Sequence, residues 1–166
     1  MLEIDHLDIL IIDDNPQITL LLSKILINKG HIVVSSNFFE EGLTKLGSKN
    51  FDVIIIDAPM PGYEKLKVIE ELERKEILRS QKVILFTGLE ISSSVVTELK
   101  MKGLYSYLKK PSNVEKLIKE LSSVPLIQNI KLTEKRISEE QTKKKFEDLR
   151  SSLFSLKHKL TPSPNS

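Results

Sequence analysis

Residues 51–61 read FDVIIIDAPMP, and this stretch decides the fold. Four β-prone apolar residues, 53–56, run directly into Asp57. An unbroken apolar run of this kind is typical of a strand buried on both faces, as in the middle of a parallel sheet. The residues that follow, APMPG, do not continue a strand, so a loop is expected. The pattern places a carboxylate at the carboxyl end of a central strand, the edge where open α/β sheets bind ligands.

Further apolar runs lie on either side of this stretch, separated by segments with helical spacing. The expected strands are 7–12, 31–34, 51–56, 83–86 and 104–108, and the expected helices are 18–28, 38–46, 64–76, 91–101 and 113–121. Strands joined by helices need right-handed crossovers, which give a parallel sheet with helices on both faces. Residues 1–124 are therefore predicted to form an α/β domain of the (βα)5 type.

The composition is that of an ordinary soluble globular protein, with 40% hydrophobic and 29% charged residues among 166. The absence of cysteine excludes disulfides, cysteine-bound metals and thiol nucleophiles. The first residues, MLEIDHLD, are acidic, unlike a signal peptide, and no apolar run approaches the ~18 residues of a membrane span. These features predict a cytoplasmic protein. No GxGxxG or GxxxxGK(S/T) phosphate loop occurs.

The charge is distributed unevenly along the chain. Residues 1–125 hold 16 basic and 18 acidic residues, a net −2, whereas residues 126–166 hold 9 and 5, a net +4. The globular part therefore lacks the basic footprint of a nucleic-acid-binding domain, and the tail is only weakly basic for one. DNA is not the favoured partner.

Polar side chains follow four of the expected strands. Asp13 and Asp14 follow the first strand, Asp57 the third, Thr87 the fourth and Lys110 the fifth. In a parallel sheet these ends lie at one edge, where three carboxylates would repel one another. A bound divalent cation or a lysine relieves such crowding, and carboxylate oxygens with few other ligands suit Mg²⁺.

Each of these residues also has a purely structural interpretation. Asp13 and Asp14, with Asn15, are able to cap a helix, Thr87 is compatible with a turn, and Lys110 precedes a proline that suits a helix start. Their shared position at strand ends favours a functional site instead. In that site Asp57 is a candidate nucleophile, Thr87 a hydroxyl donor and Lys110 a counter-charge for a phosphoryl group.

Five stretches together carry a family resemblance: IIDDNP, GHIVVSSNFFEEGLTKL, DVIIIDAPMPG, VILFTG and YSYLKKP. The resemblance covers residues 7 to about 122. The sequence resembles the CheY-like receiver domain of response regulators in two-component signalling. The resemblance implies a flavodoxin-like, doubly wound parallel sheet with strand order 2-1-3-4-5.

The resemblance also implies roles for individual residues. Asp57 would accept a phosphoryl group from the phosphohistidine of a sensor histidine kinase. Asp13, Asp14 and Asp57 would hold Mg²⁺, together with the backbone carbonyl of Pro59.

The remaining roles implied by the resemblance concern the readout. Thr87 and Lys110 would bind the phosphoryl oxygens, and Tyr107 looks like the switch aromatic of the family. Phosphorylation would draw Thr87 toward the new oxygens and let Tyr107 turn inward. The face formed by residues 90–122 would then change shape and be read by a downstream protein.

Residues 125–166 are predicted to form a helical extension of the receiver domain at 1–124, with a frayed end. A helix is expected over residues 138–160, with an apolar stripe of Phe146, Leu149, Leu153, Leu156 and Leu160. The stripe fits packing on the receiver domain, a homodimer, another protein or a membrane surface. Protein contact is favoured over DNA.

The sequence therefore predicts a single-domain response regulator that is not an enzyme beyond its own phosphotransfer and dephosphorylation. One alternative is an aspartyl-phosphate phosphohydrolase, although such enzymes typically carry a DxD pair after the first strand and a cap over the pocket. The other is a transcription regulator that acts through the basic tail. The cognate kinase, the target, the phosphoryl lifetime and the oligomeric state are left open by the sequence.

Overall fold

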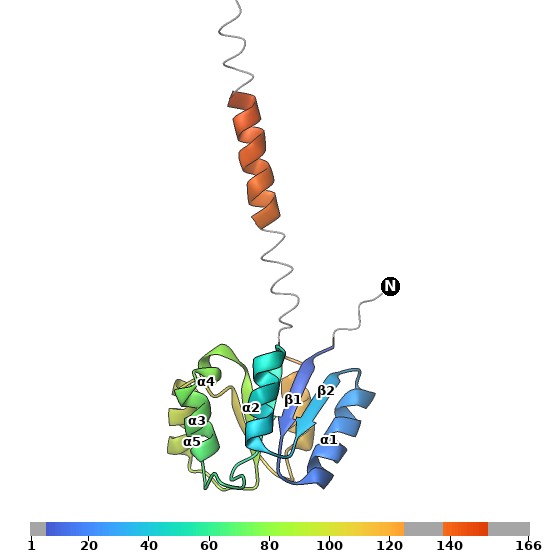
Figure 1. Ribbon diagram of the computed structural model, residues 1–166, viewed down its shortest axis with the longest axis vertical. Coiled ribbons are helices and arrows are strands. Elements are labelled where there is room, and N and C mark those ends of the chain that lie inside the picture. Colours follow the sequence, from blue (N-terminus) through green and yellow to red (C-terminus); the bar gives the residue numbers. More distant parts are fainter. Residues whose placement is uncertain (1–5, 125–137, 153–166) are drawn as a thin grey trace, which may run out of the picture. The chain divides into compact units, whose positions relative to one another are not determined.

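The computed structural model describes residues 6–124 and 138–152 of the chain. The chain consists of two compact units, Met1–Leu126 and Ile127–Ser166. The first unit contains a five-stranded sheet with helices, and the second contains a helix over residues 138–152 (Figure 1). Within the described residues, no helix has the length and apolar character needed to cross a membrane.

All five strands of the sheet are parallel, in the order β2-β1-β3-β4-β5. Their bounds are β1 Asp8–Ile12, β2 Ile32–Ser36, β3 Val53–Ile56, β4 Val83–Thr87 and β5 Ser106–Lys109. Every residue of β3 and β4 is buried, as the unbroken apolar runs require. The predicted flavodoxin-like fold and strand order are confirmed.

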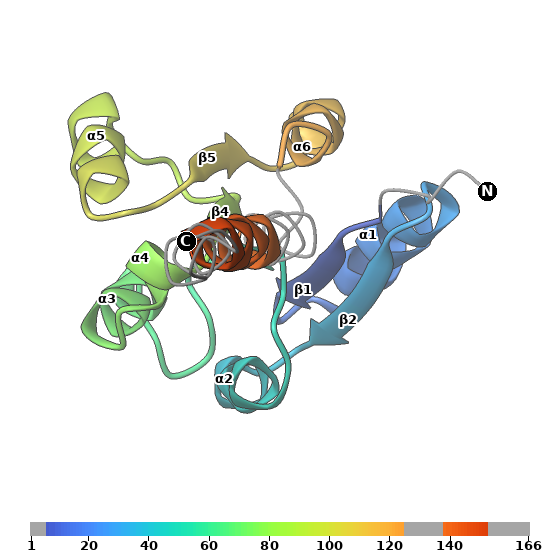
Figure 2. The same cartoon turned by 90° about the horizontal axis from the view of Figure 1, so that it is seen from above.

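Within residues 6–124, six helices cover the sheet. They are α1 Pro16–Asn28, α2 Phe39–Ser48, α3 Lys67–Arg74, α4 Ile77–Ser80, α5 Ser93–Met101 and α6 Val114–Leu121. Leucines of α1 and α6 pack into the core on one face of the sheet, and apolar residues of α2 to α5 pack into the core on the other (Figure 2). The two cores leave the carboxyl edge of the sheet to the loops.

One helix differs clearly from the sequence prediction. The helix expected at 64–76 begins only at Lys67. Gly62 and Lys65 have positive φ values of 81° and 49°, which are incompatible with a right-handed helix. A third positive φ, 58° at Glu76, lies between that helix and the short α4, which was not predicted. The other bounds in the first unit lie within two residues of the predicted ones.

The start of α1 shows which of residues 13–15 caps the helix. Asn15 is the N-cap, and its Oδ1 accepts from the backbone N–H of Gln17 at 2.9 Å and of Ile18 at 3.4 Å. Pro16 occupies the first turn, where its missing N–H has no partner to lose. Asn15 therefore caps the helix, and both preceding aspartates are available for other contacts.

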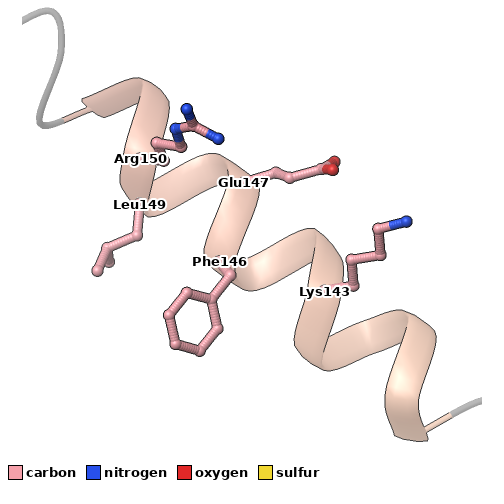
Figure 3. Close-up of a pocket in the computed structure, with 5 residues that line it drawn as sticks. All are labelled: Lys143, Phe146, Glu147, Leu149 and Arg150. Carbon is pink, nitrogen blue, oxygen red and sulfur yellow. The ribbon is translucent and has the colours of Figure 1, made fainter.

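The helix over 138–152 is the described part of the predicted 138–160 helix. Its Phe146 and Leu149 are exposed and project from the same side of the helix (Figure 3). Leu153, Leu156 and Leu160 lie outside the described residues, as do residues 125–137 and the predicted frayed end.

Candidate functional site

The loops after β1, β3 and β5 bring charged side chains together at the carboxyl edge of the sheet. Asp13 is buried directly after β1, Asp14 is exposed beside it, and Asp57 is half-buried after β3. One carboxylate oxygen of each lies within 4.8 Å of those of the other two. The three carboxylates therefore form the crowded cluster that their positions at strand ends predict.

Lys110, directly after β5, pairs with two of these carboxylates. Its Nζ donates to Asp57 Oδ2 at 2.6 Å and also to Asp13 Oδ2. The same Nζ lies 5.6 Å from the ring centroid of Phe86, and the backbone N–H of Lys110 donates to the Thr87 carbonyl at 2.8 Å. The ammonium group is thus held from several sides, and it relieves part of the repulsion between the carboxylates.

The environment of Asp13 is unfavourable for its negative charge. Burial raises the pKa of this carboxyl above its usual value of 3.8, and the charge of Asp57 acts in the same direction. The hydrogen bonds from Lys110 and from the Asn15 N–H, which reaches Oδ1 at 2.9 Å, offset this effect only in part. A further cation at the cluster would favour the ionised form of Asp13.

Thr87, the last residue of β4, is fully buried and satisfied by backbone groups. Its Oγ1 donates to the carbonyl of Ala58, the residue after Asp57, and accepts from the N–H of Leu89 at 3.0 Å. The Leu89 carbonyl in turn accepts from the Tyr107 hydroxyl at 2.9 Å. A continuous chain of hydrogen bonds therefore joins the loop after β3 to Tyr107 on β5.

Leu89 is a link in this chain that sequence reasoning missed. It contributes through its backbone N–H and carbonyl, which every residue type except proline offers. No signal in the sequence distinguishes it. Its position two residues after Thr87 places it between the two side chains that the sequence did single out.

The loop that carries Pro59 is fastened to α2. The backbones of Met60 and Tyr63 pair with each other, and the Tyr63 ring contacts the Phe39 ring edge-on at 4.7 Å. The Tyr63 hydroxyl donates to Glu40, which raises the pKa of Tyr63 above its usual value. Pro59 itself is exposed two residues past Asp57. Tyr63 is a second positioning residue that sequence reasoning missed.

The cluster has the chemistry of a site for a hard divalent cation. Three carboxylates and one ammonium leave a formal surplus of two negative charges. Oxygen ligands of this kind suit Mg²⁺, which retains several water molecules and commonly bridges carboxylates to phosphate. The residues present therefore fit a magnesium ion.

The family model for the response regulator receiver domain matches residues 9–122, more than half of the chain. The chain belongs to this family. The predicted resemblance is confirmed, and with it the assignment to two-component systems.

Curated relatives of this receiver are found in several bacteria. It is 30% identical over 115 residues to the nitrate/nitrite response regulator NarL of Escherichia coli K12, covering 68% of this chain and 52% of NarL. It is 28% identical over 116 residues to PilH of Pseudomonas aeruginosa, covering 70% of this chain and 95% of PilH. The transcriptional regulator TcrA of Mycobacterium tuberculosis is 25% identical, with 45% of its length covered. The chain thus spans about half the length of NarL and TcrA and nearly all of PilH.

Solved receiver structures share the fold. TrrA of Thermotoga maritima, in complex with Mg²⁺ and BeF, superposes with a TM-score of 0.58 at 31% identity over 70% of this chain and 97% of TrrA. CheY4 of Vibrio cholerae gives a TM-score of 0.62 at 28% identity over 72% of this chain and 99% of CheY4. The similarity to these solved structures therefore agrees with the family assignment of this chain.

Proposed function

We propose that the chain acts as a cytoplasmic response regulator. Asp57 receives a phosphoryl group from a sensor histidine kinase, and the face formed by residues 90–122 passes the signal to a downstream protein. The observation that carries this proposal is the bridge of Lys110 between Asp57 and Asp13, which joins three strand ends into one site. Apart from its own phosphotransfer and dephosphorylation, the protein is not an enzyme.

The surroundings of Asp57 support a role as the nucleophile. It is half-buried at the open edge of the sheet, and its Oδ1 is oriented by the N–H of Ala58 at 2.7 Å. In the transfer a carboxylate oxygen forms a bond to phosphorus while the phosphorus–nitrogen bond of the phosphohistidine breaks, with its electron pair left on the imidazole. Lys110 lies where it would offset the negative charge of the phosphoryl oxygens.

Asp13, Asp14 and Asp57 are the residues that would hold Mg²⁺, with the carbonyl of Pro59. When bound, the ion supplies positive charge that neutralises and orients the phosphoryl oxygens. Within the protein, the attachment of the Pro59 loop to α2 through Tyr63 keeps that loop in position beside Asp57.

Phosphorylation would act on the hydrogen-bond chain from Ala58 to Tyr107. New phosphoryl oxygens compete with the Ala58 carbonyl for the Thr87 hydroxyl. When Thr87 changes partner, the N–H of Leu89 loses its acceptor, and the Leu89 carbonyl that holds Tyr107 is released with it. The phosphoryl group thereby shifts the population of Tyr107 between two positions.

The exposed surface suits protein partners at two places. Leu20, Leu21 and Ile27 are exposed on α1, whose first residue follows the Asp13 loop, so a phosphoryl donor at the site would approach this helix. Met101 and Tyr105 are exposed within the 90–122 face. Exposed apolar groups of this kind are typical of contact surfaces.

The proposal is tested with the full chain, Mg²⁺ and either a small phosphodonor or beryllofluoride. We expect the mass to rise by one phosphoryl group with the donor, and the amide resonances of Leu89 and Tyr107 to shift with beryllofluoride. Both effects should be absent in Asp57→Ala. An unchanged mass and spectrum, or changes that persist in Asp57→Ala, would contradict the assignment.

Thr87→Val separates phosphoryl binding from the switch. It removes the hydroxyl while keeping the size of the side chain, so Asp57 should still be modified. The Tyr107 resonance should no longer respond. A normal Tyr107 response in this variant would exclude the hydrogen-bond chain as the route of the signal.

A further inference from the structure

The loop that carries Asp13 and Asp14 is held by a side chain from another part of the sequence. Asn37, directly after β2, donates from its Nδ2 to the backbone carbonyl of Asp13 at 2.7 Å. The backbone carbonyl of Ser36 accepts the N–H of Asp13 at 3.1 Å. The end of β2 therefore holds the backbone of Asp13 through both its N–H and its C=O.

The amide group of Asn37 is itself fixed by two partners. A carbonyl oxygen only accepts hydrogen bonds, so the nitrogen of the amide, and not its oxygen, has to face Asp13. The same Nδ2 donates to the Thr19 hydroxyl at 3.2 Å, and this hydroxyl donates to the Pro16 carbonyl at 3.0 Å. Thr19 is buried near the start of α1. Asn37 therefore joins the first turn of α1 to the loop that precedes it.

This contact bears on Asp14 through the geometry of the peptide group. The Asp13 carbonyl lies in the planar peptide that leads into Asp14, so a fixed carbonyl restricts the backbone before Asp14. The backbone after Asp14 is held as well, because the Asn15 N–H donates to Asp13 Oδ1 at 2.9 Å. The Asp14 carboxylate has no hydrogen bond or ion pair with any residue in 6–124 or 138–152. The position from which it reaches the cluster is therefore set by the backbone.

We propose that Asn37 is a positioning residue that fixes Asp14 in the geometry that Mg²⁺ requires and so favours Mg²⁺ over Ca²⁺. Mg²⁺ demands near-ideal octahedral geometry, whereas Ca²⁺ accepts flexible arrangements of ligands at longer distances. A loop that is held on both sides of Asp14 suits the stricter ion. The inference rests on the proposed magnesium site and is independent of phosphoryl transfer to Asp57.

The test measures Mg²⁺ and Ca²⁺ binding by the full chain, followed by the amide resonances of Asp14 and Asn15. Asn37→Leu keeps a side chain of similar size and removes both donors. We expect it to bind Mg²⁺ about tenfold more weakly, a loss typical of groups that orient metal ligands. Its affinity for Ca²⁺ should change by less than about twofold, because Ca²⁺ tolerates a looser site. A general loss of folding would instead lower both affinities.

Substitutions of Thr19 keep the test decisive if Asn37→Leu fails to fold. Thr19→Val removes the hydroxyl that accepts from Asn37 and should weaken Mg²⁺ binding in the same direction by a smaller factor. Thr19→Ser keeps the hydroxyl and should bind both ions as the native chain does. Asn50→Leu replaces an exposed asparagine before β3. It is the matched control and should leave both affinities unchanged.

Several results would overturn the inference. One is an equal loss of Mg²⁺ and Ca²⁺ affinity in Asn37→Leu, and another is an unchanged Mg²⁺ affinity in both Asn37→Leu and Thr19→Val. A native chain that does not bind Mg²⁺, or that binds it equally well as Asp14→Ala, would also exclude this role. The mass after treatment with a small phosphodonor reports separately on Asp57. A native chain that shows the expected ion selectivity without modification would contradict the proposed phosphorylation and leave the role of Asn37 intact.

Discussion

Each end of β3 carries an aspartate, and the two are held in different ways. Asp52, before the strand, is buried, and its Oδ2 accepts the backbone N–H of Asp8 at 2.8 Å. Asp57, after the strand, shares the ammonium of Lys110 with Asp13. The amino end uses a carboxylate to complete the backbone hydrogen bonding of the sheet. The carboxyl end gathers more negative charge than the fold requires, which is the pattern expected where function costs stability.

Neutralising each of the two aspartates in turn is the most direct test of this difference between the ends of β3. Asp57→Asn should abolish phosphoryl transfer completely, because an amide is not a nucleophile of this kind. Asp52→Asn should leave transfer intact and lower the free energy of unfolding by about 1 kcal/mol, since it weakens one buried hydrogen bond. Intact mass after treatment with a phosphodonor and urea denaturation measure the two effects. Loss of transfer in Asp52→Asn, in a folded protein, would erase the distinction between the two ends.

A glycine at the amino edge carries the largest expected stability effect. Gly103 has a φ of +115°, and a Cβ there would lie 2.6 Å from the carbonyl oxygen of Leu78. Gly103→Ala should therefore lower the free energy of unfolding by about 2–3 kcal/mol. Gly47→Ala is the matched control, since a Cβ there meets nothing within 4 Å and the residue lies in α2. The control should be neutral or stabilising by up to about 1 kcal/mol. Equal losses in both variants would show that the close approach to Leu78 is not the cause.

At the carboxyl edge of the sheet, removing the charge of Asp13 should stabilise the protein. Asp13 is buried among like charges, and its pKa is raised chiefly by burial. In the presence of a chelator, Asp13→Asn should raise the free energy of unfolding by about 1 kcal/mol, because it removes a charge that the site disfavours. Asp14→Asn should have a smaller effect, since Asp14 is exposed. Thermal unfolding compares the two variants, and a loss of stability in Asp13→Asn would mean that its pair with Lys110 outweighs burial.

Much of this architecture can be predicted from the sequence, because the ends of the strands can be recognised there. The apolar runs of β3 and β4 stop at Asp57 and Thr87, and the parallel order then brings those ends to one edge. The cluster of Asp13, Asp14 and Asp57 and its approach by Lys110 follow from that rule. The roles of these residues stay predictions until the phosphorylation experiment is done.

Other features leave no trace in the residue pattern. Helix α4 has four residues, too few to show a helical period in the sequence. It follows Glu76, whose left-handed backbone conformation is not predictable from a glutamate side chain. The link through Leu89 uses only backbone groups. The attachment of Tyr63 to Phe39 joins two segments distant in sequence, and a single sequence records no such contact.

The smallest predicted effect concerns pH at the amino edge. His31 is half-buried, and its Nδ1 accepts the backbone N–H of Leu7 at 3.2 Å. Burial, with smaller contributions from His6 and Lys29, lowers its pKa below the usual value of 6.5. As the pH falls below 6.5 the unfolded chain therefore takes up a proton before the native protein does, and stability decreases until the lowered pKa is reached.

His31→Asn tests this pH dependence directly. The asparagine oxygen keeps an acceptor for the Leu7 N–H but does not titrate. Between neutral pH and the lowered pKa, the melting temperature of the native chain should fall by about 1–2 °C more than that of the variant. His6→Asn is the matched control and should retain most of the slope, because burial of His31 is the larger cause of its shift. If both single variants and the native chain lose stability equally with acid, His31 is not the group responsible, and carboxylates at the opposite edge become the next candidates.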